Sequence, residues 1–99
     1  MPAYVCLIEI RLHVADSGSL KSKRRQISSI KALVRQRFGA SVAEIDGHDT
    51  WQRTTLLCAL VGGPEVGGRA DELERFVEAR FPDGCGFSRD LLTLADVRG

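Results

Sequence analysis

The side chains with the most evident chemistry in this chain are a group of cations with no acid among them. Half of the fourteen Lys and Arg residues lie between positions 21 and 37, which contain neither Asp nor Glu: Lys21, Lys23, Arg24, Arg25, Lys31, Arg35 and Arg37. A helix N-terminus carries partial positive charge, so cations in its first turn are unfavourable by a few tenths to about 1 kcal/mol each. Acids from elsewhere in the fold, or a bound anion, could offset that cost.

Two interpretations of this basic stretch differ in what its charges contact. In the first, the cations lie on a solvated helix face and need no partner. In the second, they bind phosphates of RNA and displace the counterions condensed on it. A formal net charge of +1 excludes neither interpretation, because the acids concentrate in another helix and leave one side positive. The second interpretation predicts five phosphate contacts: Lys21, Arg24, Arg25, Lys31 and Arg35. Lys23 is predicted instead to form a structural ion pair in the region of Asp46 and Asp49.

The stretch DGHDTWQR, which begins at Asp46, is the most chemically mixed part of the chain. Arg53 could contact a phosphate or pair with a nearby acid. Trp51 could stack on a base of single-stranded RNA, although a lone Trp in a strand is more often a packing anchor. Asp46, His48 and Asp49 could form a metal or acid–base cluster, but their spacing matches no metal motif and the sequence is typical of a turn. We therefore predict no catalytic residue, no metal and no cofactor, and a protein that is not an enzyme.

Hydrophobic periodicity predicts the elements that must position these residues. Alternation with a period of two predicts four strands, at 4–14, 41–46, 51–61 and, less regularly, 86–97. Helical spacing of apolar residues predicts helices at 20–38 and 70–81, and Gly39 is predicted to end the first. The glycine-rich segment 62–68 lacks the Gly-Lys-Ser/Thr of a phosphate-binding loop and is predicted to be a flexible connector.

This order of elements predicts an α+β protein with one domain over residues 1–99. The usual packing of strand, helix, strand, strand, helix, strand is the ferredoxin-like βαββαβ fold, with an antiparallel four-stranded sheet and two helices on one face. In that topology the start of the first helix and the connection between the second and third strands share one end of the molecule. The basic stretch should therefore lie beside the stretch DGHDTWQR.

The same topology leaves one face of the sheet without helices. The third predicted strand is apolar on both faces, and the first strand adds apolar residues to the uncovered one. Exposed apolar surface costs about 25 cal/mol per Å² and often marks an interface. We therefore predict a homodimer packed sheet to sheet through five residues of the first strand, the last three at its rim: Val5, Leu7, Glu9, Arg11 and His13.

Composition is that of an ordinary globular protein, with 43% hydrophobic and 27% charged residues. Cys6, Cys58 and Cys85 are odd in number and far apart, and we interpret them as reduced core thiols. The sequence contains no recognisable signal peptide and no apolar run of membrane-spanning length. These features predict a cytoplasmic protein without a membrane partner.

Three segments together resemble the YlxP-like family, which comprises small bacterial proteins of unknown function: SLKSKRR (19–25), FGASVAEID (38–46) and DTWQRTTL (49–56). The similarity runs over nearly the whole chain. It implies a ferredoxin-like fold and a link with translation or ribosome maturation, and it brings no catalytic residue with it. The leading prediction is a non-catalytic RNA-binding or ribosome-associated module. The alternative is a protein–protein interaction module or structural homodimer with no nucleic-acid role.

Overall fold

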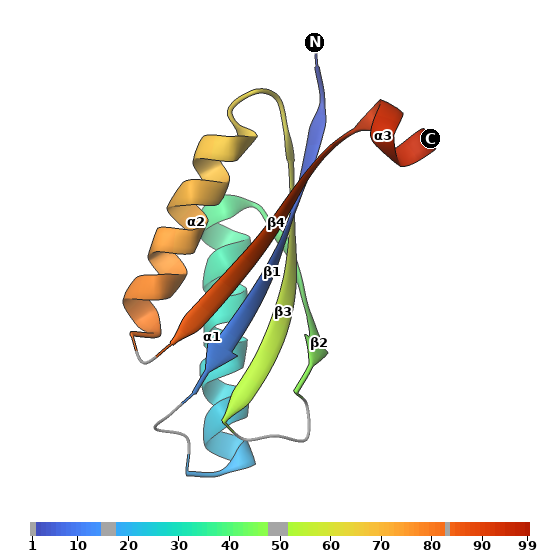
Figure 1. The fold of residues 1–99 in the computed structure, drawn as a ribbon. Helices are drawn as coiled ribbons and strands as arrows, with labels where there is room; N and C mark the ends of the chain where they lie inside the picture. The colour runs from blue at the N-terminus through green and yellow to red at the C-terminus, as the bar shows by residue number, and fades with distance from the viewer. Residues whose placement is uncertain (1, 15–17, 48–51, 83) are drawn as a thin grey trace.

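The computed structural model of the protein describes residues 2–14, 18–47, 52–82 and 84–99. Its elements, in chain order, are β1 (Tyr4–His13), α1 (Leu20–Phe38), β2 (Ser41–Asp46), β3 (Arg53–Gly62), α2 (Val66–Arg80), β4 (Cys85–Thr93) and α3 (Leu94–Arg98). The two long helices lie on the same side of the sheet, and α3 lies apart from them at the end of β4 (Figure 1). The fold therefore has two layers: α1 and α2 cover one face of the sheet and leave the other face open.

The four strands form one antiparallel sheet in the order β2-β3-β1-β4. The central strand β1 pairs with β3 over its whole length, from Tyr4 opposite Gly62 to His13 opposite Arg53. Its other edge pairs with β4. The predicted α+β fold with a four-stranded antiparallel sheet is confirmed, and β1 and β3 occupy the centre as their apolar sequences predicted.

The core lies between the sheet and the two long helices, and alternating residues of β1 and β3 reach it. Buried strand residues include Cys6, Ile8, Ile10, Leu12, Leu56, Cys58 and Leu60, which pack with Ile30 and Val34 of α1 and Leu73 and Val77 of α2. Helix α1 begins at a side-chain cap, because the Ser19 hydroxyl accepts a hydrogen bond from the Ser22 N–H. It ends at Gly39 in the left-handed conformation, as predicted. Caps and core contacts thus fix the orientation of α1 on the sheet.

The C-terminal end of the chain differs from the prediction of a strand over 86–97. Strand β4 ends at Thr93, and the chain continues as the short helix α3. A capping box starts that helix: the Thr93 hydroxyl accepts from the Asp96 N–H at 3.1 Å, and the Asp96 carboxylate accepts from the Thr93 N–H at 2.8 Å. The prediction was wrong because this local signal was not recognised, and the predicted six-element order therefore lacks α3.

The connector between β3 and α2 is shorter than the predicted segment 62–68. Strand β3 extends to Gly62, and α2 begins at Val66, whose side chain is buried. Between them, the Glu65 carboxylate accepts a hydrogen bond from the Gly63 N–H at 3.0 Å. Hydrogen bonds from the backbone of Glu65 and from that of Gly63 lower the pKa of the Glu65 carboxyl. Burial of Val66 and these local bonds give this segment a defined turn, which its glycine content did not indicate.

Candidate nucleic-acid interface

The start of α1 and the end of β2 meet at one end of the molecule (Figure 1). The contact between them is direct, since the Lys23 ammonium donates a hydrogen bond to the backbone carbonyl of Gly47. This confirms the predicted proximity of the basic stretch to the segment that begins at Asp46. Residues 48–51, including His48, Asp49 and Trp51, lie outside the described part of the chain.

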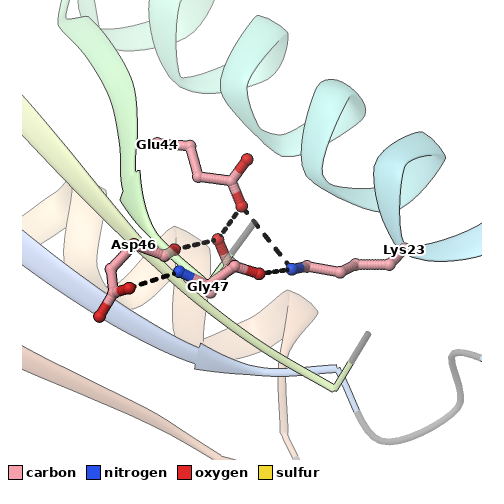
Figure 2. Close-up of polar contacts among 5 residues, drawn as sticks. Lys23, Glu44, Asp46 and Gly47 are labelled. Carbon is pink, nitrogen blue, oxygen red and sulfur yellow. Dashed lines mark hydrogen bonds and ion pairs between the residues drawn. The ribbon is translucent and has the colours of Figure 1, made fainter. Parts of the chain in front are cut away.

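Lys23 is the buried member of the basic stretch, and its side chain points away from solvent toward β2 (Figure 2). Only 2% of the residue is exposed. Its Nζ lies 3.8 Å from Oε2 of Glu44, which also accepts a hydrogen bond from the Thr54 hydroxyl. The Asp46 carboxylate accepts instead from the N–H of Gly47 at 2.8 Å. Lys23 therefore reaches the predicted region, and the structure adds Glu44, which the sequence analysis did not name as its partner.

Three other cations of α1, Lys21, Arg24 and Arg25, are exposed on its first two turns. No side-chain hydrogen bond or ion pair joins any of the three to another described residue. The first turn of α1 also contains no acid that could compensate the helix dipole. These side chains are therefore charged, accessible and available to an external anion.

The remaining two predicted phosphate contacts on α1 have different surroundings. One guanidinium nitrogen of Arg35 donates to the carbonyl of Val42 at 2.8 Å, which ties α1 to β2. Lys31 is half-buried in a shallow groove of about 290 Å³ that it shares with Arg24, Ser28 and Glu44. Arg35 is therefore exposed to solvent and also makes a structural contact. Lys31 lies beside Arg24 along one flank of the helix.

A second shallow groove, of about 280 Å³, follows the other flank of α1 where it meets α2. Arg25 and Arg80 line it together with the polar side chains Gln26 and Ser29. Apolar side chains, among them Leu33, Phe81 and Ile27, form part of the two grooves. The outward surface of α1 has a cation beside each groove, and such separated charges can follow a phosphate backbone.

Two arginines outside α1 hold elements together, and the sequence analysis missed both. Arg89 of β4 lies 2.9 Å from both Asp71 and Glu74, so it joins β4 to α2. Arg69 donates to the backbone carbonyls of Phe38, at 2.7 Å, and Val61, at 3.1 Å. Backbone acceptors leave no mark in a sequence, and the pairs of Arg89 depend on the register of β4. Both cations therefore differ from Lys21, Arg24 and Arg25, which have no side-chain hydrogen bond or ion pair with another described residue.

The open face of the sheet divides into two regions along β1. The cross-strand register places mainly apolar residues toward one end, which we call the apolar half: Val5, Leu7, Leu57, Ala59, Val61 and Leu92. Toward the other end, His13 lies directly opposite Arg53 and Arg11 lies opposite Thr55; we call Arg11, His13 and Arg53 the basic end. Between the regions, Glu9 lies 2.6 Å from Arg11. The five predicted interface residues of β1 thus span two surfaces of different chemistry.

Within residues 2–14, 18–47, 52–82 and 84–99, no three His, Cys, Asp or Glu side chains gather in a way that could hold a metal ion. None of the helices there is long and apolar enough to cross a lipid bilayer. The candidate surfaces of the described chain are therefore the outward side of α1 and the two regions of the open sheet face.

Fold and surface together define a small α+β protein with two long helices on one face of its sheet and three exposed cations, Lys21, Arg24 and Arg25, at the start of α1. Residues 5–83 match the family described as "Protein of unknown function (DUF503)", and the chain belongs to that family. It is 42% identical over 73 residues to "Uncharacterized protein YlxP" of Bacillus subtilis (strain 168), an alignment that covers 71% of this chain and 77% of that protein. The predicted membership of a YlxP-like family is confirmed.

A solved structure with a similar fold is the "De novo designed protein Foldit4". The TM-score is 0.60, and the alignment covers 92% of this chain and 97% of the designed chain at 13% sequence identity. At that identity the likeness concerns the fold alone.

Proposed function

We propose that this protein is a non-catalytic RNA-binding module associated with the ribosome, and that the outward side of α1 contacts RNA phosphates. The observation that carries the proposal is the contrast between buried and exposed cations of one helix. Lys23 is held by Gly47 and Glu44, whereas Lys21, Arg24 and Arg25 have no acid partner among the described residues. A structural role explains the first cation and leaves the other three without one.

Electrostatics support the same proposal. Cations near an N-terminal turn without acids are unfavourable by a few tenths to about 1 kcal/mol each, and a phosphate bound there removes part of that cost. Each phosphate contact also releases counterions from the nucleic acid. The strand order β2-β3-β1-β4, with two helices on one face, further supports a ferredoxin-like classification in which α3 is an addition.

Replacing Arg24 and Arg25 together with glutamate should weaken RNA binding by at least about tenfold, because two phosphate contacts become repulsions. The measurement is the dissociation constant for single-stranded RNA over a series of salt concentrations. Each lost contact should reduce the slope of log affinity against log salt by about 0.7, so the double variant should lose about 1.4. Both residues are exposed, so the melting temperature should remain nearly unchanged.

A matched control carries the same change of charge on exposed residues of other elements, Arg75→Glu with Arg98→Glu. This control should keep both the affinity and the salt slope. Equal losses in the two double variants would show that net charge, not the surface of α1, governs binding. Undiminished binding by Arg24→Glu with Arg25→Glu would remove α1 from the interface.

A second proposal concerns self-association, and the apolar half of the open sheet face favours it. Val61 is 67% exposed there, beside the half-buried Val5 and Leu7. Helix α3 adds Leu94 and Val97, which are 52% and 61% exposed, and it buries none of its residues. A second copy packed against this face would cover apolar surface at about 25 cal/mol per Å². We propose that the protein forms a homodimer in this way, which would also duplicate the cationic helices.

The change Leu7→Asp should convert the dimer to monomer, because it replaces an apolar contact and places a second carboxylate directly opposite Asp90 on this face. Light scattering during size-exclusion chromatography should show a fall from twice to once the 10.9 kDa chain mass. The exposed Ala79→Asp on α2 is the control and should remain dimeric. Circular dichroism should confirm that both variants are folded. A wild-type protein that elutes as a monomer at micromolar concentration would contradict the proposal.

A further inference from the structure

We propose that the basic end of the open sheet face is a binding site for the phosphate monoester group of an organic molecule of nucleotide size. An open pocket of about 730 Å³ lies there, lined by residues that include Arg11, His13, Arg53, Thr55, Asp46 and Gly86. Its volume falls within the range of about 300 to 1,000 Å³ that is typical of small-molecule sites. This site goes beyond the proposed RNA surface, because its cations Arg11, His13 and Arg53 belong to β1 and β3 and not to α1; the two regions approach each other at Gly47, which lines the pocket and accepts a hydrogen bond from Lys23.

Polar and cationic side chains of the basic end face each other across neighbouring strands. His13 and Arg53 lie directly opposite each other across β1 and β3. No side-chain hydrogen bond or ion pair joins His13 or Arg53 to another described residue. An anion between the two side chains would accept hydrogen bonds from the guanidinium and from the imidazole N–H.

Two glycines let the side chains of Arg11 and His13 pack closely against the chain around β4. Gly86 of β4 lies opposite Arg11, and Gly84, which precedes β4, accepts a hydrogen bond from the His13 N–H at 3.1 Å. A Cβ at position 86 would stand 3.1 Å from Nη2 of Arg11 and 3.3 Å from its Nε. The hydrogen bonds of Arg11 to Glu9 and Ser88 both use Nη1. Nη2 and Nε therefore lie over Gly86, in the space that a side chain there would take, and are free of those bonds.

The chemistry of these donors selects the ligand class. A guanidinium offers paired N–H groups that match phosphate oxygens, and here two of them flank one imidazole. A phosphate monoester carries a charge of about −1.5 to −2 at pH 7, which complements this set better than a single carboxylate does. Inorganic phosphate would fill only a small part of an open pocket of about 730 Å³. Thr55 and Asp46 offer hydroxyl and carboxylate partners for the hydroxyl groups of the remaining organic part.

The test uses the wild-type protein and AMP as the probe, with adenosine as the matched compound without phosphate. Amide chemical shifts should change at residues 11–13, 53–55 and 84–86, and AMP should bind at least about tenfold more tightly than adenosine. Arg53→Gln should reduce AMP affinity at least about tenfold. Gly86→Ala should reduce it severalfold without any change of charge, because the added methyl group displaces the Arg11 guanidinium. Thermal melts should show that both variants are folded.

Arg24→Gln with Arg25→Gln is the control for the RNA surface, and it should leave AMP binding unchanged. The monoester could belong to the end of an RNA strand or to a free nucleotide, and two oligoribonucleotides that differ only in having a 5′-phosphate or a 5′-hydroxyl distinguish these cases. Tighter binding of the 5′-phosphorylated strand, with shifts at the basic end, assigns the site to an RNA end. Binding of AMP without that preference assigns it to a free nucleotide. Either result supports the site. Equal binding of AMP and adenosine, AMP affinity unaffected by Arg53→Gln, or no response to AMP or the 5′-phosphorylated strand would overturn it.

Discussion

The variant Lys23→Met should lower the free energy of unfolding by about 3 kcal/mol, which is the lower end of the cost of removing one partner from a buried ion pair. The Lys23 ammonium is the donor to the Gly47 carbonyl and lies 3.8 Å from Glu44. Methionine keeps most of the side-chain volume but leaves the largely buried Glu44 carboxylate without this cation. For a domain of this size the melting temperature should fall by about 12 to 24 °C.

The matched control is Lys21→Met, the same chemical change two positions earlier on the exposed side of α1. It should shift stability by no more than about 0.5 kcal/mol. Adding Glu44→Gln to Lys23→Met should recover part of the loss, because it removes the uncompensated charge. If Lys23→Met and Lys21→Met have the same stability, the buried pair does not stabilise the fold.

Alkaline pH should destabilise the protein through the buried Cys58. Burial disfavours the thiolate and raises the pKa of this thiol from 9.0 to about 11. The unfolded chain therefore releases the proton near pH 9, while the folded chain retains it to about pH 11. Over that window the unfolded state binds fewer protons, so stability falls as pH rises. The total loss from this thiol should be about 2 to 3 kcal/mol, measured by denaturant unfolding under reducing conditions.

In the variant Cys58→Ala, the free energy of unfolding should fall less steeply with pH than in the wild type. The slopes are compared, and not the absolute stabilities, because the substitution also changes core packing. Burial raises the pKa of the Cys6 and Cys85 thiols as well, so some dependence should remain. Cys85→Ala is the control, since Cys85 is only half-buried. An unchanged slope in Cys58→Ala would show that this thiol does not couple folding to pH.

The sequence was informative where a residue's role follows from periodicity. The angle between successive side chains predicts the two faces of β1 and the span of α1. It also predicts that Lys23 points toward the sheet. Helix α3 could not be found in that way, because it buries none of its residues and so has no core-facing stripe. Only the capping box at Thr93 and Asp96 indicated it.

The basic end of the sheet shows why the candidate sites were harder to predict. Arg11 and His13 were recognised as residues of the uncovered face and were placed at the rim of a dimer interface. Their chemistry depends on which residues lie opposite them, and that requires the register that pairs His13 with Arg53 and Arg11 with Gly86. The sequence shows that position 86 is a glycine. It does not show that the Arg11 guanidinium packs against that glycine.

The outer strands of the sheet bear on how this protein can aggregate. An unprotected outer strand offers free backbone N–H and C=O groups to another chain, which is a common route to fibrils. Here β2 has only six residues and an irregular register between Glu44 and Asp46, and β4 carries the charged pair Arg89 and Asp90 before turning into a helix. Both margins therefore resist extension by a further strand. The homodimer proposed above would form through side chains of the open face and would leave both margins free of added strands.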